Sequence, residues 1–271
     1  MPRWFVPFLI SLFVTTTAVA EGDHLKSLKT GVEAQGWEAV GRLDIGGKGF
    51  CTGALIAPDL VLTAGHCLYD SDTHDRIDPG QIEFLAGWRN GRASAYRSIK
   101  QAVVHSDFDY DGPNNAASVR NDLALLQLDQ PIRTGRILPF QTSAQPRAGE
   151  RVGIVSYAKD RAEAPSLQNT CNVLAQQDGV LVTSCDVDFG SSGAPIFAFV
   201  DGQARIVSVV SAKAEISGDR VALGTSLHVP LARLQADLVA GLGSFSTTPK
   251  GSKRIIVGDH ARTSDAKFVK P

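Results

Sequence analysis

The sequence has little net charge and few aromatic residues. Its 27 Lys and Arg residues nearly balance 28 Asp and Glu residues, which gives a formal net charge of −1, and aromatic residues make up 7% of the chain. Without an excess of basic residues there is no electrostatic argument for a nucleic-acid partner, and we expect none. Hydrophobic residues reach an ordinary 43% over 271 positions. Such a chain is globular and long enough to bury a core of its own.

Long hydrophobic runs are missing beyond the N-terminus. The apolar stretch at residues 4–14 is shorter than the about 20 residues that a spanning helix needs, and Pro7 interrupts it. Small residues at Ala18 and Ala20 precede a polar segment, which is typical of a secretory signal peptide cleaved after Ala20. The alternative is a membrane anchor, for which the stretch is too short. We therefore expect a signal peptide at residues 1–20, a secreted or periplasmic protein and no membrane insertion.

Cysteine is scarce, with four residues and no Cys-x-x-Cys pair. The intervals between the cysteines lack a second His or Cys at ligand spacing, which argues against zinc, and we expect no metal. In an exported protein an even number of cysteines favours disulfides. Of the three pairings, the positions favour Cys51 with Cys67 and Cys171 with Cys185. Each bond would close a loop of about 15 residues and contribute about 3 kcal/mol in the chain-entropy account.

Short apolar or alternating runs, separated by Gly, Pro, Asp and Asn, make up most of the chain. Examples are residues 39–45, 60–62, 123–128, 194–200 and 206–210. Many short strands with frequent turn signals predict an all-β sandwich or barrel.

Three segments depart from this strand pattern. Residues 21–35 are polar with little periodicity, and we interpret them as a leader or propeptide. Leucines spaced three and four apart within residues 230–239, followed by Gly241, predict a helix that closes the domain. Residues 242–271 are rich in Ser, Thr, Lys and Gly and indicate a flexible tail. The folded domain would then span residues 36–241.

A histidine and an aspartate each stand at the end of an apolar run. His66 follows residues 60–62 and adjoins Cys67, so a strand end and a crosslink would hold its ring rigidly, as a general base requires. Asp122 heads residues 123–128, and a buried carboxylate needs a partner such as an imidazole N–H. The alternatives are a structural histidine and a turn or strand-start aspartate.

A serine between glycines, Ser192, precedes the apolar run at 194–200. Flanking glycines let the backbone approach a substrate closely, and a serine becomes a nucleophile when a base is adjacent. Small neighbours would also let the N–H groups of Gly190 and Ser192 point at one oxyanion. The alternative is a plain Gly/Ser turn.

Four segments together resemble the signature segments of trypsin-like serine peptidases, in that family's order. They are Cys51-Thr52-Gly53-Ala54-Leu55-Ile56, Thr63-Ala64-Gly65-His66-Cys67, Asp122-Leu123-Ala124-Leu125-Leu126 and Gly190-Ser191-Ser192-Gly193-Ala194-Pro195. The resemblance covers most of residues 36–239. It is greatest to secreted bacterial members, including relatives of the glutamyl endopeptidases.

The resemblance implies two six-stranded antiparallel β-barrels, divided near residues 130–140, with the active site in the cleft between them. His66 would be the general base, Asp122 its orienting partner and Ser192 the nucleophile, in the His–Asp–Ser chain order of this class. The Cys51–Cys67 disulfide would bracket the histidine. The implied activity is hydrolysis of a polypeptide through an acyl-enzyme by a monomer that needs no cofactor.

The position before the nucleophile departs from the family pattern. The family usually has Asp there, where it receives the ammonium of a newly cut N-terminus, whereas this chain has Ser191. The activation sequence Arg-Ile-Val-Gly-Gly is also missing near the start of the mature chain. How the site becomes active is therefore left open.

The residues that would contact a substrate side chain give conflicting indications. Asp186 lies six residues before Ser192, where trypsin-like members that cut after Arg or Lys have an anion. The segment from Ser211 to Lys213 resembles the strand that pairs with substrate backbone. Ser211 would also support Asp122, and Lys213 at the pocket rim would favour an acidic residue. Because Asp186 is alternatively a turn residue, basic, acidic, small and apolar preferences all stay open.

Three other functions compete with this interpretation. Residues 107–112 mimic the opening of a calcium loop, but Ser118 stands where a bidentate Glu is needed, so an acidic surface loop is the better interpretation. An esterase or lipase would have a helix after the nucleophile, whereas an apolar strand follows Ser192. A catalytically silent homologue that serves as a binding module is the remaining alternative.

Overall fold

The computed structural model of the chain describes residues 25–113, 115–216 and 218–246. The predicted signal peptide at residues 1–20 and the tail beyond residue 246 lie outside the described residues. In the described part, no helix combines the length and the apolar character needed to cross a membrane.

The first sheet is seven-stranded, and six of its strands close into a barrel. In sheet order its strands are β14 (Ser244–Ser246), β6 (Ala95–Val104), β5 (Ile82–Ala86), β2 (Val40–Ile45), β3 (Gly49–Ala57), β4 (Leu60–Thr63) and β7 (Ala124–Leu128). Antiparallel pairing between β6 and β7 closes the barrel, and β14 is an additional edge strand. Side chains such as Leu43, Phe84 and Leu125 fill its interior and are fully buried.

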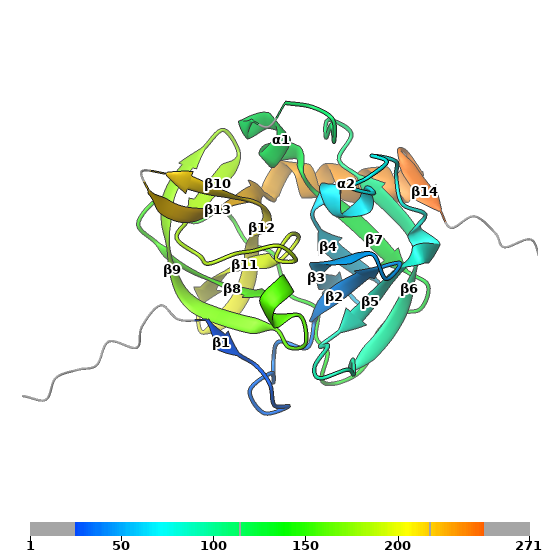
Figure 1. The fold of residues 1–271 in the computed structure, drawn as a ribbon, viewed down its shortest axis with the longest axis horizontal. Helices are drawn as coiled ribbons and strands as arrows, with labels where there is room; N and C mark the ends of the chain where they lie inside the picture. The colour runs from blue at the N-terminus through cyan, green and yellow to red at the C-terminus, as the bar shows by residue number, and fades with distance from the viewer. Residues whose placement is uncertain (1–24, 114, 217, 247–271) are drawn as a thin grey trace, which may run out of the picture.

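The second sheet repeats this arrangement. Its strands, in sheet order, are β1 (Lys26–Ser27), β9 (Ser166–Gln177), β10 (Val180–Thr183), β13 (Asp219–Ser226), β12 (Gln203–Ile216), β11 (Pro195–Val200) and β8 (Arg151–Ser156). Pairing of β8 with β9 closes the six-stranded barrel, and β1 is the extra edge strand. The predicted pair of six-stranded antiparallel barrels is confirmed, and Figure 1 shows them side by side.

Short helices connect and cover the barrels. The α-helices are α1 (Ala116–Asn121) and α2 (His228–Ala240), and the 3-10 helices are η1 (Gly65–Leu68), η2 (Pro79–Gln81) and η3 (Lys159–Arg161). The predicted C-terminal helix is α2, which contacts β6 and β7 of the first barrel. It ends at Gly241, whose φ of 69° is the left-handed conformation that glycine adopts at helix C-termini.

Each end of the described chain pairs with the barrel formed by the other half of the sequence: the N-terminal end with the second barrel and the C-terminal end with the first. Ser27 pairs with Ser166 in β9, the N–H of Leu28 donates to the carbonyl of Pro165 at 2.8 Å, and the Leu28 side chain is buried. This part of the predicted leader or propeptide is therefore built into the second barrel. At the other end, β14 pairs with β6, so the segment predicted to be a flexible tail starts with an ordered strand.

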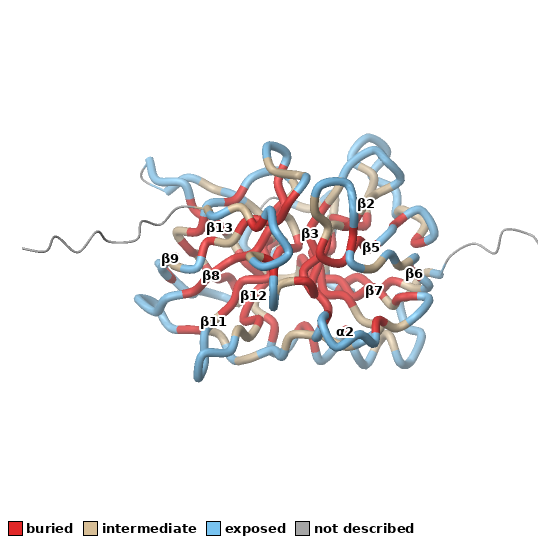
Figure 2. Tube along the Cα trace, turned by 90° about the horizontal axis from the view of Figure 1, so that it is seen from below, coloured by how far each residue is buried: buried red, intermediate tan, exposed pale blue. Residues whose placement is uncertain are grey.

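An aromatic cluster packs the two barrels against each other. The ring of Phe197 in β11 lies 5.2 Å from that of Trp37, which precedes β2, and 4.8 Å from that of Phe140. Phe140 lies in the segment between β7 and β8, where the predicted barrel boundary also falls. Tilted and edge-on pairs of this kind add about 0.5–1.5 kcal/mol beyond simple burial. Figure 2 shows the buried residues concentrated in the middle of the molecule.

Candidate active site

His66 and Asp122 meet because the two strands beside them are paired. β4 and β7 are antiparallel, with Thr63 opposite Ala124, so the end of one strand adjoins the beginning of the other. Oδ1 of Asp122 accepts the backbone N–H of His66 at 2.8 Å, and Oδ2 lies 2.7 Å from Nδ1 of the ring. A carboxylate only accepts, so Nδ1 carries the hydrogen and Nε2 is left as the acceptor. This is the tautomer that a general base needs.

The Asp122 carboxylate is buried, with 3% of the residue exposed. In addition to the two contacts with His66, Oδ2 accepts the hydroxyl of Ser211 at 2.5 Å. Hydrogen bonds of this kind offset the cost of burying a charged carboxylate. The family resemblance implied that Ser211 supports Asp122, and the structure brings the two together from different barrels.

The pKa of His66 results from opposed influences. Burial lowers it, and both the charge of Asp122 and the hydrogen bond to that carboxylate raise it. The net result is a pKa above the ordinary value of 6.5. The imidazolium that forms during proton transfer is therefore stabilised by its neighbour.

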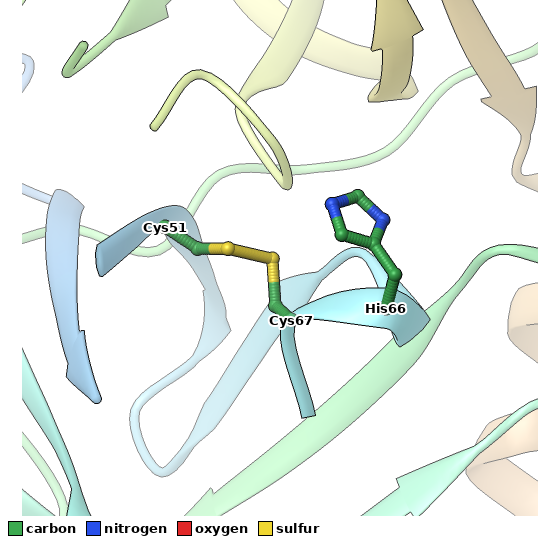
Figure 3. A group of neighbouring side chains, drawn as sticks. All are labelled: Cys51, His66 and Cys67. Carbon is green, nitrogen blue, oxygen red and sulfur yellow. A yellow bond between two sulfur atoms is a disulfide. The ribbon is translucent and has the colours of Figure 1, made fainter. Parts of the chain in front are cut away.

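The two predicted disulfides are present, Cys51–Cys67 and Cys171–Cys185. Figure 3 shows the first of them beside the His66 ring, where it links β3 to η1. Both sulfur atoms are bonded to each other and are not the thiolates that bind metals. Cys51, Cys67 and His66 therefore lie close together as a disulfide beside the histidine that it positions, and not as a set of metal ligands.

The loop from Asp188 to Gly193 is held by backbone hydrogen bonds that leave two N–H groups unused. Thr52 contacts it twice, through its hydroxyl to the carbonyl of Gly190 and through its N–H to the carbonyl of Ser192, both at 2.8 Å. Among the hydrogen bonds of the described residues, none uses the N–H of Gly190 or Ser192. Neither donor is taken up inside the protein, which is compatible with the predicted role in binding an oxyanion.

Glycine is required on both sides of Ser192. Gly190 has a φ of 95°, and a Cβ there would lie 2.3 Å from the Phe50 ring. Gly193 has a φ of 77°, and its Cβ would lie 2.1 Å from Oγ1 of Thr63. Only a residue without a side chain fits these left-handed and crowded positions, so the loop conformation depends on both glycines.

Ser191 is fully buried and faces away from the cleft into a polar network. Its hydroxyl lies 3.1 Å from the carbonyl of Tyr157 and 3.4 Å from both Oγ of Ser156 and Nη2 of Arg161. Arg161 also donates to the carbonyl and the hydroxyl of Ser156 at 2.9 and 3.0 Å. Its pKa is lowered by burial, and Asp160 opposes that effect. The Arg161 guanidinium thus supports the loop from inside the protein, through Ser156 and Ser191.

A cleft of about 1110 Å³ brings the predicted residues together. Its wall includes His66, Gly190, Ser192, Ser211 and Lys213. Residues far apart in the sequence thus border a single space that is large enough for a peptide.

Asp186 is not among the residues that line this cleft. It is exposed, and its N–H donates to Oε1 of Gln168 at 2.8 Å. The cleft is instead lined by Val187, Asp188 and Phe189, which counting back from Ser192 did not identify. The available signal was Cys185, which does not stand where the family has its pocket cysteine and so indicates that this loop is built differently.

Comparisons with known proteins identify the family. A model of the trypsin-like peptidase domain matches residues 51–205, more than half of the chain. The glutamyl endopeptidase of Bacillus licheniformis is 26% identical over 155 residues, 55% of this chain and 45% of that protein. Brachyurin of Leptuca pugilator is 26% identical over 161 residues, 58% of this chain and 66% of that protein. The aligned part thus spans about half to two thirds of these relatives.

Solved structures show the same architecture. The structure of a Glu endopeptidase in complex with MPD superposes with a TM-score of 0.64 at 19% identity, over 79% of this chain and 97% of the other. At this identity the likeness concerns the fold alone. Taken with the two closed barrels and the family match over residues 51–205, it follows that the chain belongs to the trypsin-like peptidase domain family.

Proposed function

We propose that this protein is a serine endopeptidase that hydrolyses polypeptides through an acyl-enzyme. The observation that carries the proposal is the His66 ring held by Asp122 in a cleft shared with Ser192, with the N–H groups of Gly190 and Ser192 unused. The name of one relative above, glutamyl endopeptidase, agrees with a protease. The disulfides and the predicted signal peptide support export to an oxidising compartment.

The proposed reaction assigns a defined role to each of these groups. Oγ of Ser192 attacks the scissile carbonyl, and Nε2 of His66 takes its proton. Asp122 keeps Nδ1 protonated and stabilises the imidazolium. The N–H groups of Gly190 and Ser192 donate to the oxygen that becomes negative. His66 then gives the proton to the leaving amine, which departs and leaves the acyl-enzyme. His66 next takes a proton from a water molecule, whose oxygen attacks the acyl carbonyl. The proton passes to Oγ of Ser192 as the acid is released.

The pH dependence follows from the raised pKa of His66. Only neutral His66 accepts the serine proton, so kcat/KM is expected to increase with pH and to reach half its plateau above pH 6.5. Asp122→Asn removes the charge that raises this pKa and keeps the burial that lowers it, so the midpoint should move to lower pH. Initial rates on one peptide from pH 5 to 9 measure both midpoints. A wild-type midpoint at or below 6.5 contradicts the assignment.

Covalent labelling tests the nucleophile directly. A fluorophosphonate should modify the mature protein at Ser192, with the site located by peptide mapping, because an activated serine attacks phosphorus. Ser192→Ala should take up no label. Ser191 serves as an internal control, since its buried hydroxyl should stay unmodified. A folded protein that resists the reagent would favour the silent binding module.

A further inference from the structure

An ion pair crosses the wall of the cleft beside the nucleophile. Nζ of Lys213 lies 2.6 Å from Oδ1 of Asp188 and 4.1 Å from the centre of the Phe189 ring. Asp188 is further oriented by the N–H of Phe189, which donates to the same oxygen at 2.8 Å. The pair joins β12 to the loop that carries Ser192, so any peptide bound at Ser192 lies next to both charges.

The lining near this pair is mostly apolar. Val187, Val210 and Ala212 line the cleft together with Phe189, and Lys159, whose N–H donates to the carbonyl of Phe189 at 2.8 Å, also lines it. Val187 and Lys213 also border a second hollow of about 200 Å³. The other charged residues there, Glu215 and Arg220, are direct partners across β12 and β13. Asp186, the anion expected to bind a basic side chain, is exposed and outside the cleft lining.

The position of the oxyanion donors indicates which substrate residue meets this wall. The carbonyl that accepts from Gly190 and Ser192 belongs to the residue on the acyl side of the cut bond. Asp188, Phe189 and Lys213 line the same cleft as these donors, so the side chain of that residue can contact them. The Lys213 and Asp188 side chains are about half exposed, at 48% and 49%, and so accessible to it.

On the basis of the proposed endopeptidase function, we propose that the Lys213–Asp188 pair makes the site select uncharged, apolar side chains on the acyl side of the cut bond. A substrate carboxylate must displace Asp188 from Lys213, and a substrate cation must displace Lys213 from Asp188. An apolar side chain leaves the pair intact and packs on Phe189 and Val187. The site thus selects against charged side chains because each charge of the pair already has a partner.

Single substitutions should leave first one and then the other charge without its ion-pair partner. Asp188→Asn keeps an acceptor for the Phe189 N–H and leaves Lys213 unpaired, so cleavage after Glu and Asp should increase relative to Leu by about fivefold or more. Lys213→Met keeps the apolar stem and leaves Asp188 unpaired, so cleavage after Arg and Lys should increase similarly. The double variant removes both charges and should return to the apolar profile.

Digestion of a proteome-derived peptide library, read by mass spectrometry, measures these preferences. Each count is divided by cleavage after Leu in the same digest, so a loss of folded protein does not alter the result. Opposite shifts in the two single variants and their cancellation in the double variant support the proposal. A wild-type preference for charged residues, or shifts below twofold, overturns it. If the wild-type protein neither cleaves the library nor takes up fluorophosphonate, the endopeptidase function itself fails.

Discussion

Asp122→Asn is expected to lower kcat by about four orders of magnitude while leaving the protein folded. The amide is nearly the same shape as the carboxylate, so its oxygen can still accept the N–H of His66. It carries no charge to stabilise the imidazolium, however, and its NH₂ group facing Nδ1 favours the tautomer in which Nε2 is protonated. Only the small fraction of rings in the other tautomer can then accept the Ser192 proton. The burial of Asp122, at 3% exposed, removes water as a substitute partner.

Steady-state rates on one peptide substrate, with thermal unfolding measured in parallel, test this expectation. Ser211→Ala is the matched control, because it removes one hydrogen bond to Oδ2 and keeps the charge. It should cost about tenfold to a hundredfold, in line with the loss of a hydrogen bond to a charged group. Ser192→Ala sets the lower limit of the assay. A rate for Asp122→Asn within tenfold of the wild type would show that His66 does not depend on this carboxylate.

Arg161→Ala is expected to lower kcat by about a hundredfold, although Arg161 does not line the cleft. Its guanidinium holds Ser156 and reaches the hydroxyl of Ser191, and Ser191 lies between the two oxyanion donors. Without Arg161 the loop should no longer keep both N–H groups aligned, and losing one such donor costs about 10²–10³ in kcat. Arg161 would therefore be a residue that positions the two N–H donors.

A transition-state analogue separates this role from simple stability. A peptide aldehyde forms a tetrahedral adduct that needs the oxyanion donors, so Arg161→Ala should weaken its binding about as much as it lowers kcat, with a smaller change in KM. Arg161→Lys keeps a charge but not the planar fork, and should recover activity only in part. Unchanged kcat and aldehyde affinity in a protein of lower Tm would assign Arg161 to stability alone.

The same network bears on activation. In family members with Asp before the nucleophile, that carboxylate pairs with a new N-terminal ammonium. Ser191 is uncharged, and its hydroxyl is hydrogen-bonded to Arg161 and to the carbonyl of Tyr157. The segment around Leu28 is meanwhile built into the second barrel. The loop is thus held by side chains of the folded domain, while residues 26–28 are paired with the second barrel.

The local sequence was sufficient to predict those features whose signal lies in consecutive residues. The alternating runs predicted the strands, and Gly241 marked the end of α2, because periodicity and left-handed glycines are properties of short segments. His66, Asp122 and Ser192 were singled out by the segments around them. Cys51 and Cys67 were paired by their neighbouring positions, and the disulfide is present.

Only the tertiary structure decided which side chains share a space. Two aspartates two residues apart have different surroundings: Asp186 is exposed outside the cleft lining, and Asp188 lines the cleft and binds Lys213. Counting residues could not separate them, because the direction of a loop side chain depends on distant contacts. The role expected of Arg161 depends in the same way on a fold that brings η3 against the loop of Ser191. The sequence thus determined the candidate chemistry, whereas long-range packing determined which charges line the cleft.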